Sequence, residues 1–396
     1  MIDQKKNVVT AFNQWKSRPA EERFLDIDQM QAVMTKRRER CEDVGPYSVA
    51  DMTVEPGPEN SLALVDGDNG GALLNNFSLN QLAASVKAPA GYLRTLPNHL
   101  AAECLNEGLP EFGETERHLL YEHGDQVGTI RAITSPQYSR YWDNEVIADL
   151  ANSLQADGWR VPPCRPFPGC PDNMTWTATA NDILPGDSQK LSIREGDLCG
   201  PGGLYSSDRD SFVFMVNQNR TIETPSGPMF RALICKNSEV GQAAFGISCF
   251  LYSAVCGNHI MWGAAEVADV KIRHRGEADL AAIRAKAAMA GAVAAAENAS
   301  SYVEETTISL AAETLTDSNA VQQATKLPKD TILAAETLAK EYPQDHGDRL
   351  GTTWAWVQGL TRASQQRGYT ADRASIDGAA ANLLKPIAKQ VHSVAA

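Results

Sequence analysis

The sequence predicts an α+β protein with a curved, largely antiparallel sheet, helices on one side of it, and an alanine-rich helical C-terminal region. Three observations predict this class. Short apolar runs typical of strands recur between residues 118 and 274, and short turns separate several of them, which favours antiparallel pairing. Apolar residues at helical spacing appear before and among these strands. After Gly276, alanine-rich sequence of high helix propensity replaces the strand-like runs.

These changes of pattern divide the 396 residues into three regions. Residues 1–72 form an N-terminal helical and loop region, 73–276 an α+β core domain, and 277–396 a helical C-terminal region. In the first region a helix is expected at 20–40. The segment 46–72 is rich in Pro, Gly, Asp and Asn, and it predicts loops with one strand at 61–65.

The core domain begins with a predicted pair of helices. Ser78 is expected to cap the first, which runs to about Val86, and the second begins near Pro89. A hairpin is predicted at 118–134 and a helix at 143–157, while 164–203 is rich in turn residues and predicts loops. Further strands are predicted at 159–164, 174–180, 212–217, 231–235, 247–255, 259–262 and 267–274.

Four helices are predicted in the C-terminal region, at 278–299, 330–341, 351–366 and 374–390. The alanines of 278–299 allow a second helix to approach closely. We therefore expect this helix to contribute to packing or self-association, and the protein to be a homo-oligomer.

Composition limits the classes of protein that fit. With 43% hydrophobic and 21% charged residues the chain can build a globular core. A net charge of −13 argues against coating of duplex nucleic acid by bulk electrostatics. There is no apolar run of about 18 residues and no signal-peptide pattern, so we expect no membrane contact and a cytoplasmic location. The eight cysteines are scattered, which indicates reduced thiols.

Sequence motifs for catalysis and cofactor binding are not found. The chain has no P-loop, no nucleophile elbow and no H-E-x-x-H pair. Cys256 and His259 have a spacing that could hold a metal, but no second pair repeats it, as a structural zinc site requires. We therefore expect no metal, no cofactor and no catalytic residues.

Two polar blocks interrupt the apolar strands near the end of the core domain. The first covers 237–241 and contains Asn237 and Glu239, and the second covers 256–259 and contains Asn258 and His259. Polar side chains between core strands cost free energy unless they are hydrogen-bonded or bind something. Each block is therefore either a satisfied structural turn or part of a site.

The segment 135–144 combines three aromatic residues with an arginine just before a predicted helix. Aromatic rings and guanidinium planes stack on unpaired bases, so Tyr138, Arg140 and Tyr141 are candidate nucleic-acid contacts. In the alternative interpretation, Tyr138 and Trp142 anchor the helix to the core.

Basic residues alternate in the last predicted strand of the core. Lys271, Arg273 and Arg275 are expected on one face, where they would form a track for backbone phosphates. The same pattern suits an exposed strand that discourages edge pairing. The basic run at 36–40 is typical of a solvated helix face, with a nucleic-acid contact as the alternative.

At these blocks the chain resembles a family of phage- and plasmid-encoded proteins, the phage/plasmid-like family, known only as domain of unknown function 932. The resemblance spans roughly 75 to 385 and rests on 77–97, 135–144, 237–241, 256–258 and 354–361. His259 stands where the family often has a second glycine, which puts the local turn in doubt. The resemblance implies a phage origin and hence the host-cell cytoplasm. It brings no established catalytic residues.

By fold analogy, a helix-backed antiparallel sheet with a helical tail is similar to the single-strand annealing proteins of phages. The first hypothesis is an ATP-independent factor that binds and anneals single-stranded DNA in replication or recombination, through the two basic and aromatic segments. The alternative is an acidic phage protein that binds and modulates a host enzyme or defence complex. An enzyme that uses the two polar blocks is a third interpretation.

Overall fold

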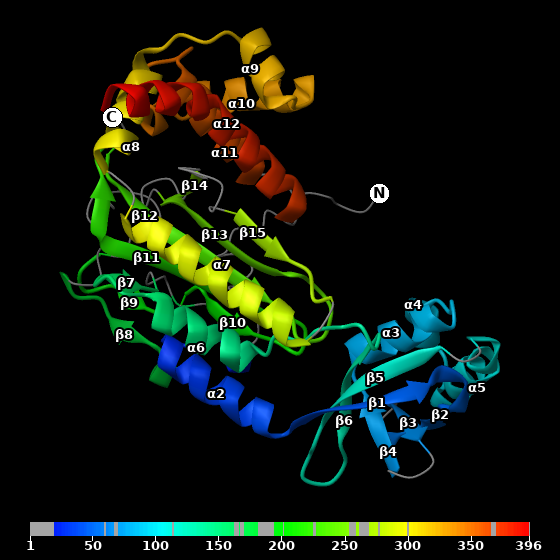
Figure 1. Ribbon diagram of the computed structural model, residues 1–396. Helices are drawn as coiled ribbons and strands as arrows, with labels where there is room; N and C mark the ends of the chain where they lie inside the picture. The colour runs from blue at the N-terminus through cyan, green and yellow to red at the C-terminus, as the bar shows by residue number, and fades with distance from the viewer. Residues whose placement is uncertain are drawn as a thin grey trace.

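The computed structural model confirms the α+β class (Figure 1). Two sheets, each largely antiparallel, are joined side by side, and a helical region covers one end of the larger sheet. The structure describes residues 20–58, 61–66, 70–112, 115–161, 166, 170–180, 194–200, 202–224, 227–252, 259–260, 269–275, 278–298, 301–365 and 370–395.

A six-stranded sheet has the order β1-β5-β6-β4-β3-β2, and its only parallel pairing joins β4 to β6. The sequence predicted β3, β5 and β6 but assigned most of the rest to loops, because Gly and Pro interrupt the strand pattern there. The six strands are β1 (Cys41–Ser48), β2 (Thr53–Pro56), β3 (Leu62–Asp66), β4 (Gly70–Leu74), β5 (Glu116–Glu122) and β6 (Thr129–Thr134).

Helices α3 (Asn76–Ser85), α4 (Ala90–Leu93) and α5 (Asn98–Gly108) accompany this sheet, and Leu82 and Leu105 lie in its core. Asn75, not Ser78, caps α3, because its side chain accepts the amide N–H groups of both Phe77 and Ser78. The second predicted helix is two helices, with Pro97 at the start of α5. Proline fits the start of a helix at no cost, whereas in a helix interior it removes a backbone hydrogen bond.

A side chain from α5 satisfies the backbone of the edge strand β2. The amide of Asn106 on α5 accepts the N–H of Val54 at 2.7 Å and donates to the C=O of the same residue at 2.9 Å. This double contact replaces the pairing that a further strand would make. It satisfies an edge that could otherwise pair with another chain.

The larger, seven-stranded sheet has the order β10-β11-β12-β13-β14, with β7 also paired to β11 and β15 to β13. Its pairings are all antiparallel. The sequence predicted each of these strands except β10, whereas the predicted strand 174–180 lies in a separate two-stranded sheet. The members of the larger sheet are β7 (Trp159–Arg160), β10 (Leu204–Ser206), β11 (Ser211–Ile222), β12 (Met229–Asn237), β13 (Phe245–Tyr252), β14 (His259–Ile260) and β15 (Asp269–Ile272), and a separate pair joins β8 (Trp176–Thr177) to β9 (Leu198–Cys199).

Three helices cover one face of this sheet, as predicted: α2 (Ile27–Glu39), α6 (Asp143–Ser153) and the alanine-rich α7 (Ala278–Asn298) (Figure 1). Met289 and Val293 of α7 pack on strand residues such as Ile247. The opposite side of α7 is exposed and carries Ile283 with several alanines.

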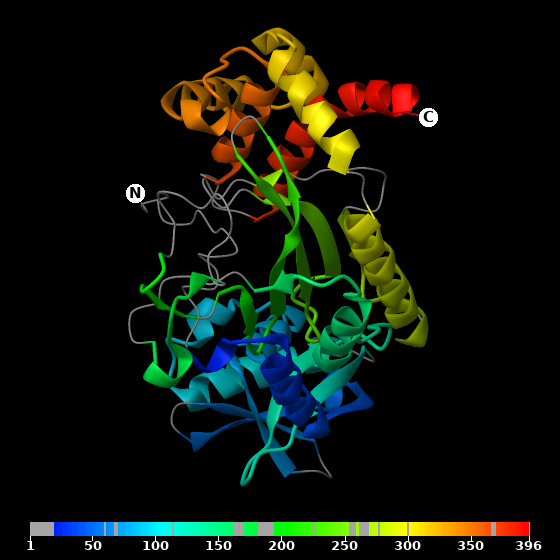
Figure 2. The same ribbon diagram turned by 90° about the vertical axis from the view of Figure 1, so that its left-hand side faces the viewer.

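The C-terminal helices form a separate layer over the far ends of the long strands (Figure 2). They are α8 (Ser301–Glu313), α9 (Ser318–Thr325), α10 (Lys329–Glu341), α11 (Thr353–Gln365) and α12 (Thr370–Ala395). The sequence predicted α10, α11 and α12 and missed α8 and α9. The hydrophobic core of this layer also includes three residues of the sheet strands, Ile222, Met229 and Leu251.

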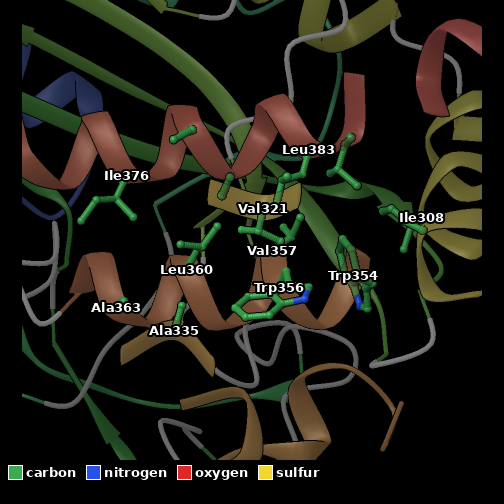
Figure 3. Packing of buried hydrophobic residues seen from close by; sticks show 14 of the residues in the cluster. Ile308, Val321, Ala335, Trp354, Trp356, Val357, Leu360, Ala363, Ile376 and Leu383 are labelled. Atoms are coloured by element: carbon green, nitrogen blue, oxygen red, sulfur yellow. The ribbon is translucent and has the colours of Figure 1, made fainter. Parts of the chain in front are cut away.

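Helix α11 is the centre of this layer, and each side chain from 353 to 361 is buried. Trp354, Trp356 and Leu360 pack among the neighbouring helices (Figure 3). Gly359 lies against α10, where an added Cβ would stand 2.2 Å from the carbonyl oxygen of Ala335. A residue with no side chain is therefore required at this crossing.

We predict that Gly359→Ala lowers the free energy of unfolding by about 1–3 kcal/mol, because the new methyl group overpacks the crossing. Thermal or urea unfolding measures the change. Gly378→Ala on α12 is the matched control, since no atom lies within 4 Å of the added Cβ there. The control is expected to be neutral or slightly stabilising, as alanine favours helix. Equal stability of the two variants would contradict the close helix contact.

Candidate functional site

The first polar block forms the turn between β12 and β13, at the junction of the two sheets. Its backbone carbonyls accept hydrogen bonds from side chains of two separate segments. Ser238 O accepts the hydroxyl of Tyr138 at 2.7 Å, Glu239 O accepts the guanidinium of Arg140, and Val240 O accepts the side-chain amide of Gln81 at 2.9 Å. Helix α3 and the 135–142 segment are therefore tied to the end of the larger sheet.

The carboxylate of Glu239 lies at the centre of this junction and is buried. It accepts Arg131 Nη1 from β6 at 2.6 Å and the backbone N–H of Asp143 at 3.1 Å. Burial opposes the ionised form, but the charge of Arg131 and these hydrogen bonds outweigh it and lower the pKa of Glu239. Glu239 therefore carries its charge inside the protein and also satisfies the first turn of α6.

Asp143 is a second buried carboxyl group beside Glu239. It accepts Ser211 Oγ at 2.7 Å and Asn237 Nδ2 at 2.8 Å, and the same amide nitrogen donates to Tyr141 O at 2.7 Å. Burial, reinforced by the charge of Glu239, raises the pKa of Asp143 to about 7. The pKa of Glu239 is thus lowered and that of Asp143 is raised, so Asp143 is the carboxyl group of this pair that binds a proton near neutral pH.

These contacts show that Asn237 and Glu239 form a hydrogen-bonded structural junction. Both side chains are buried and bonded to groups of this chain. In the second polar block, Asn258 lies outside the described residues. His259 begins β14, where its backbone pairs with that of Tyr252.

Most of the candidate side chains in the 135–144 segment bind other residues of this protein. Tyr141 is 2% exposed and its hydroxyl donates to Asp149 at 2.8 Å. Arg140 is buried and pairs with Asp43 at 3.0 Å in addition to Glu239 O. Neither side chain is therefore available to a ligand in this structure. Tyr138 is half-buried, with its ring stacked on His274 at 5.2 Å between centroids.

A cationic edge, formed by Lys236, Arg273 and Arg275, lies beside the junction. In the sheet, Lys236 of β12 pairs with Gly246 of β13, which pairs with Lys271 of β15, so the two lysines occupy one row about 10 Å apart. Strand β15 ends at Ile272, and Arg273 and Arg275 follow it. Lys236, Arg273 and Arg275 are exposed and have no carboxylate partner among the described residues.

The two basic segments singled out in the sequence meet in space. Tyr138 and Arg275 form an isolated antiparallel β-bridge, and Ser139 N donates to His274 O at 3.3 Å. Lys236 and Arg131 were not among the candidate site residues predicted from the sequence. Arg131 could have been noticed as a charge inside the apolar run 130–133, but the position of Lys236 depends on strand register.

The basic run at 36–40 has mainly structural contacts. Arg37 donates to Ser207 O at 2.8 Å, Arg38 donates to Cys41 O at 2.9 Å and lies 3.8 Å from the centre of the Trp142 ring, and Arg40 pairs with Glu122. These arginines bind α2 to neighbouring segments. The described residues include no cluster of side chains that could hold a metal ion and no helix suited in length and apolarity to cross a membrane.

A known protein family matches the part of the chain that forms most of the larger sheet and of the helical layer. Residues 194–385 match the family model "Domain of unknown function (DUF932)". The DUF932 match contains the turn 238–241, the cationic edge and α11, whereas the 135–144 segment and α3 precede it. No curated protein and no solved structure matches the chain. The DUF932 description assigns no function.

We predict that Glu239→Gln destabilises the protein by about 3–5 kcal/mol, because it leaves the buried charge of Arg131 without its partner. Chemical denaturation measures the loss. The control is Glu103→Gln on the exposed side of α5, which is expected to change stability by less than about 0.5 kcal/mol. A variant as stable as the wild type would show that the ion pair does not hold the junction.

Asp143 predicts a pH dependence of stability. Its pKa is higher in the folded protein than the ordinary 3.8, so the proton it binds stabilises the fold at acidic pH. This contribution is lost as the pH rises through about 7. Glu239 acts oppositely, and its contribution is lost only as the pH falls below its ordinary pKa of 4.5.

Asp143→Asn cannot ionise but keeps an oxygen for Ser211 and Asn237. The variant is therefore expected to lose less stability than the wild type between about pH 5 and pH 8, measured by denaturation at each pH. Asp125→Asn, at an exposed position of the hairpin loop, should retain the wild-type profile. Parallel profiles for wild type and Asp143→Asn would show that Asp143 does not hold a proton in the fold.

Proposed function

We propose that this protein binds single-stranded nucleic acid through the backbone phosphates, at the cationic edge of the larger sheet. The observation that carries the proposal is the exposure of Lys236, Arg273 and Arg275 without carboxylate partners, in a protein of net charge −13. Many other cations are paired internally, such as Arg131 with Glu239 and Arg231 with Glu304. Exposed unpaired cations gathered at one edge can instead neutralise phosphates.

The flexibility of a single strand favours it over a duplex. A single strand can follow a short cationic track and turn away from the acidic remainder of the surface. Duplex DNA is stiff over about 150 base pairs, so binding at the edge would hold its other phosphates against that acidic surface. The proposal therefore assigns weak binding to a duplex of the same length.

Contacts to phosphates alone leave the bases free. Tyr141 and Arg140 are occupied inside the protein, so the proposal uses no stacking by these two residues. A bound strand whose bases remain exposed can pair with a complementary strand, which is what an annealing factor does. This annealing requires no nucleotide hydrolysis, and we propose that it serves the replication or recombination of a phage.

We predict that the triple variant Lys236→Glu, Arg273→Glu, Arg275→Glu binds a fluorescent oligothymidine at least about tenfold more weakly than the wild type at low salt. Fluorescence anisotropy measures the affinity. The slope of log affinity against log salt concentration should also fall by about 2, which corresponds to the loss of three phosphate contacts on a single strand.

The matched control replaces Lys329, Lys385 and Lys389 of the helical layer with glutamate. These lysines are exposed, and the control has the same net charge as the test variant. Its affinity should exceed that of the test variant several-fold. Equal affinities of the two variants would reject the cationic edge. Absence of wild-type binding at micromolar protein would reject nucleic-acid binding and favour a protein partner.

A further inference from the structure

His274 is a buried histidine that lies between the two exposed arginines of the cationic edge. It is 7% exposed, whereas Arg273 and Arg275 on either side of it are exposed. Its ring stacks on Tyr138 with an angle of 23° between the planes. His274 therefore anchors a short segment whose neighbours face solvent.

The hydrogen bonds of His274 define its protonation state. Nδ1 lies 3.0 Å from Ser139 O, and because a carbonyl oxygen can only accept, Nδ1 carries the proton. Nε2 is buried and has no hydrogen-bond partner among the described residues. The ring is thus a neutral imidazole. Its Nδ1–H has an acceptor, whereas a second proton on Nε2 would have no acceptor among the described residues.

The charged surroundings also oppose a second proton. Burial lowers the pKa of His274, and the charge of Arg140 adds to this, while the hydrogen bond to Ser139 acts in the opposite direction. Arg140 lies across the Tyr138 ring and is itself paired with Asp43. Asp143 and Glu239 lie on the Tyr138 side of the stack, where their charges help to raise the pKa of Tyr138.

We propose that protonation of His274 releases the segment Arg273 to Arg275 from Tyr138 and Ser139, so that this part of the cationic edge has a fixed position only while His274 is neutral. A proton on Nε2 would place an unpaired charge in a buried site. The contacts to be lost are the hydrogen bonds between His274 and Ser139 and the bridge between Tyr138 and Arg275.

The link between this release and nucleic acid rests on the proposed function. Two arginines held in place lose less conformational entropy on binding a phosphate chain than two mobile ones. Each long side chain that must be ordered costs about 0.5–1.5 kcal/mol. Acidification would therefore weaken binding, although it makes the protein as a whole less negative.

Hydrogen exchange of the Ser139 amide tests the release without any ligand. After correction for the intrinsic rate, protection at Ser139 should fall by up to about tenfold between pH 7.5 and pH 5.5 in the wild type, because the released imidazole regains its ordinary pKa of 6.5 and binds a proton. In His274→Asn, Nδ2 can replace Nδ1 as the donor to Ser139 O but does not titrate, so protection should not change with pH. His99→Asn, at an exposed position of α5, is the control and should behave as the wild type.

Constant protection at Ser139 in the wild type would overturn the proposal, and so would an equal loss of protection in His274→Asn. A parallel anisotropy measurement at constant ionic strength separates the release of the segment from its effect on nucleic-acid binding. Wild-type affinity for the oligothymidine should fall about threefold or more on acidification, and that of His274→Asn should not. Release without any change in affinity would confirm the role of His274 and reject Arg273 and Arg275 as nucleic-acid contacts.

Discussion

The buried ion pair between Arg131 and Glu239 is the contact on which the arrangement of the two sheets depends. Arg131 belongs to the six-stranded sheet and Glu239 to a turn of the larger one, and their side chains are 3% and 5% exposed. Charges removed from water to this extent are tolerated only with close partners and further hydrogen bonds. Cys41 and Glu122 near Arg131, and the N–H of Asp143 beside Glu239, supply them.

This junction also determines which residues remain available at the surface. The turn that carries Glu239 accepts the hydroxyl of Tyr138, and the ring of Tyr138 in turn stacks on His274. One connected set of contacts thus runs from the interior of the protein to the cationic edge. The buried polar groups position the exposed arginines and do not themselves reach solvent.

Local patterns explain how much of the fold could be predicted. The long helices α7, α10 and α11 follow from alanine content and helical spacing, and β11, β12 and β13 from apolar runs between turns. Strands β1, β2 and β4 have no such signal, because Gly and Pro occur in or beside them. Their pairing with other strands, and the contact of Asn106 with β2, makes them strands.

For the candidate site, the sequence by itself determined that 237–241 must be satisfied or bind something, and that basic residues accumulate at 271–275. Only the tertiary structure decided that Glu239 meets Arg131, 108 residues away, and that Tyr141 and Arg140 are buried while Lys236 is exposed. The physical reason is the sequence distance over which each effect acts. Propensity and periodicity act between near neighbours, whereas burial and ion pairing depend on strand register and on the docking of two sheets.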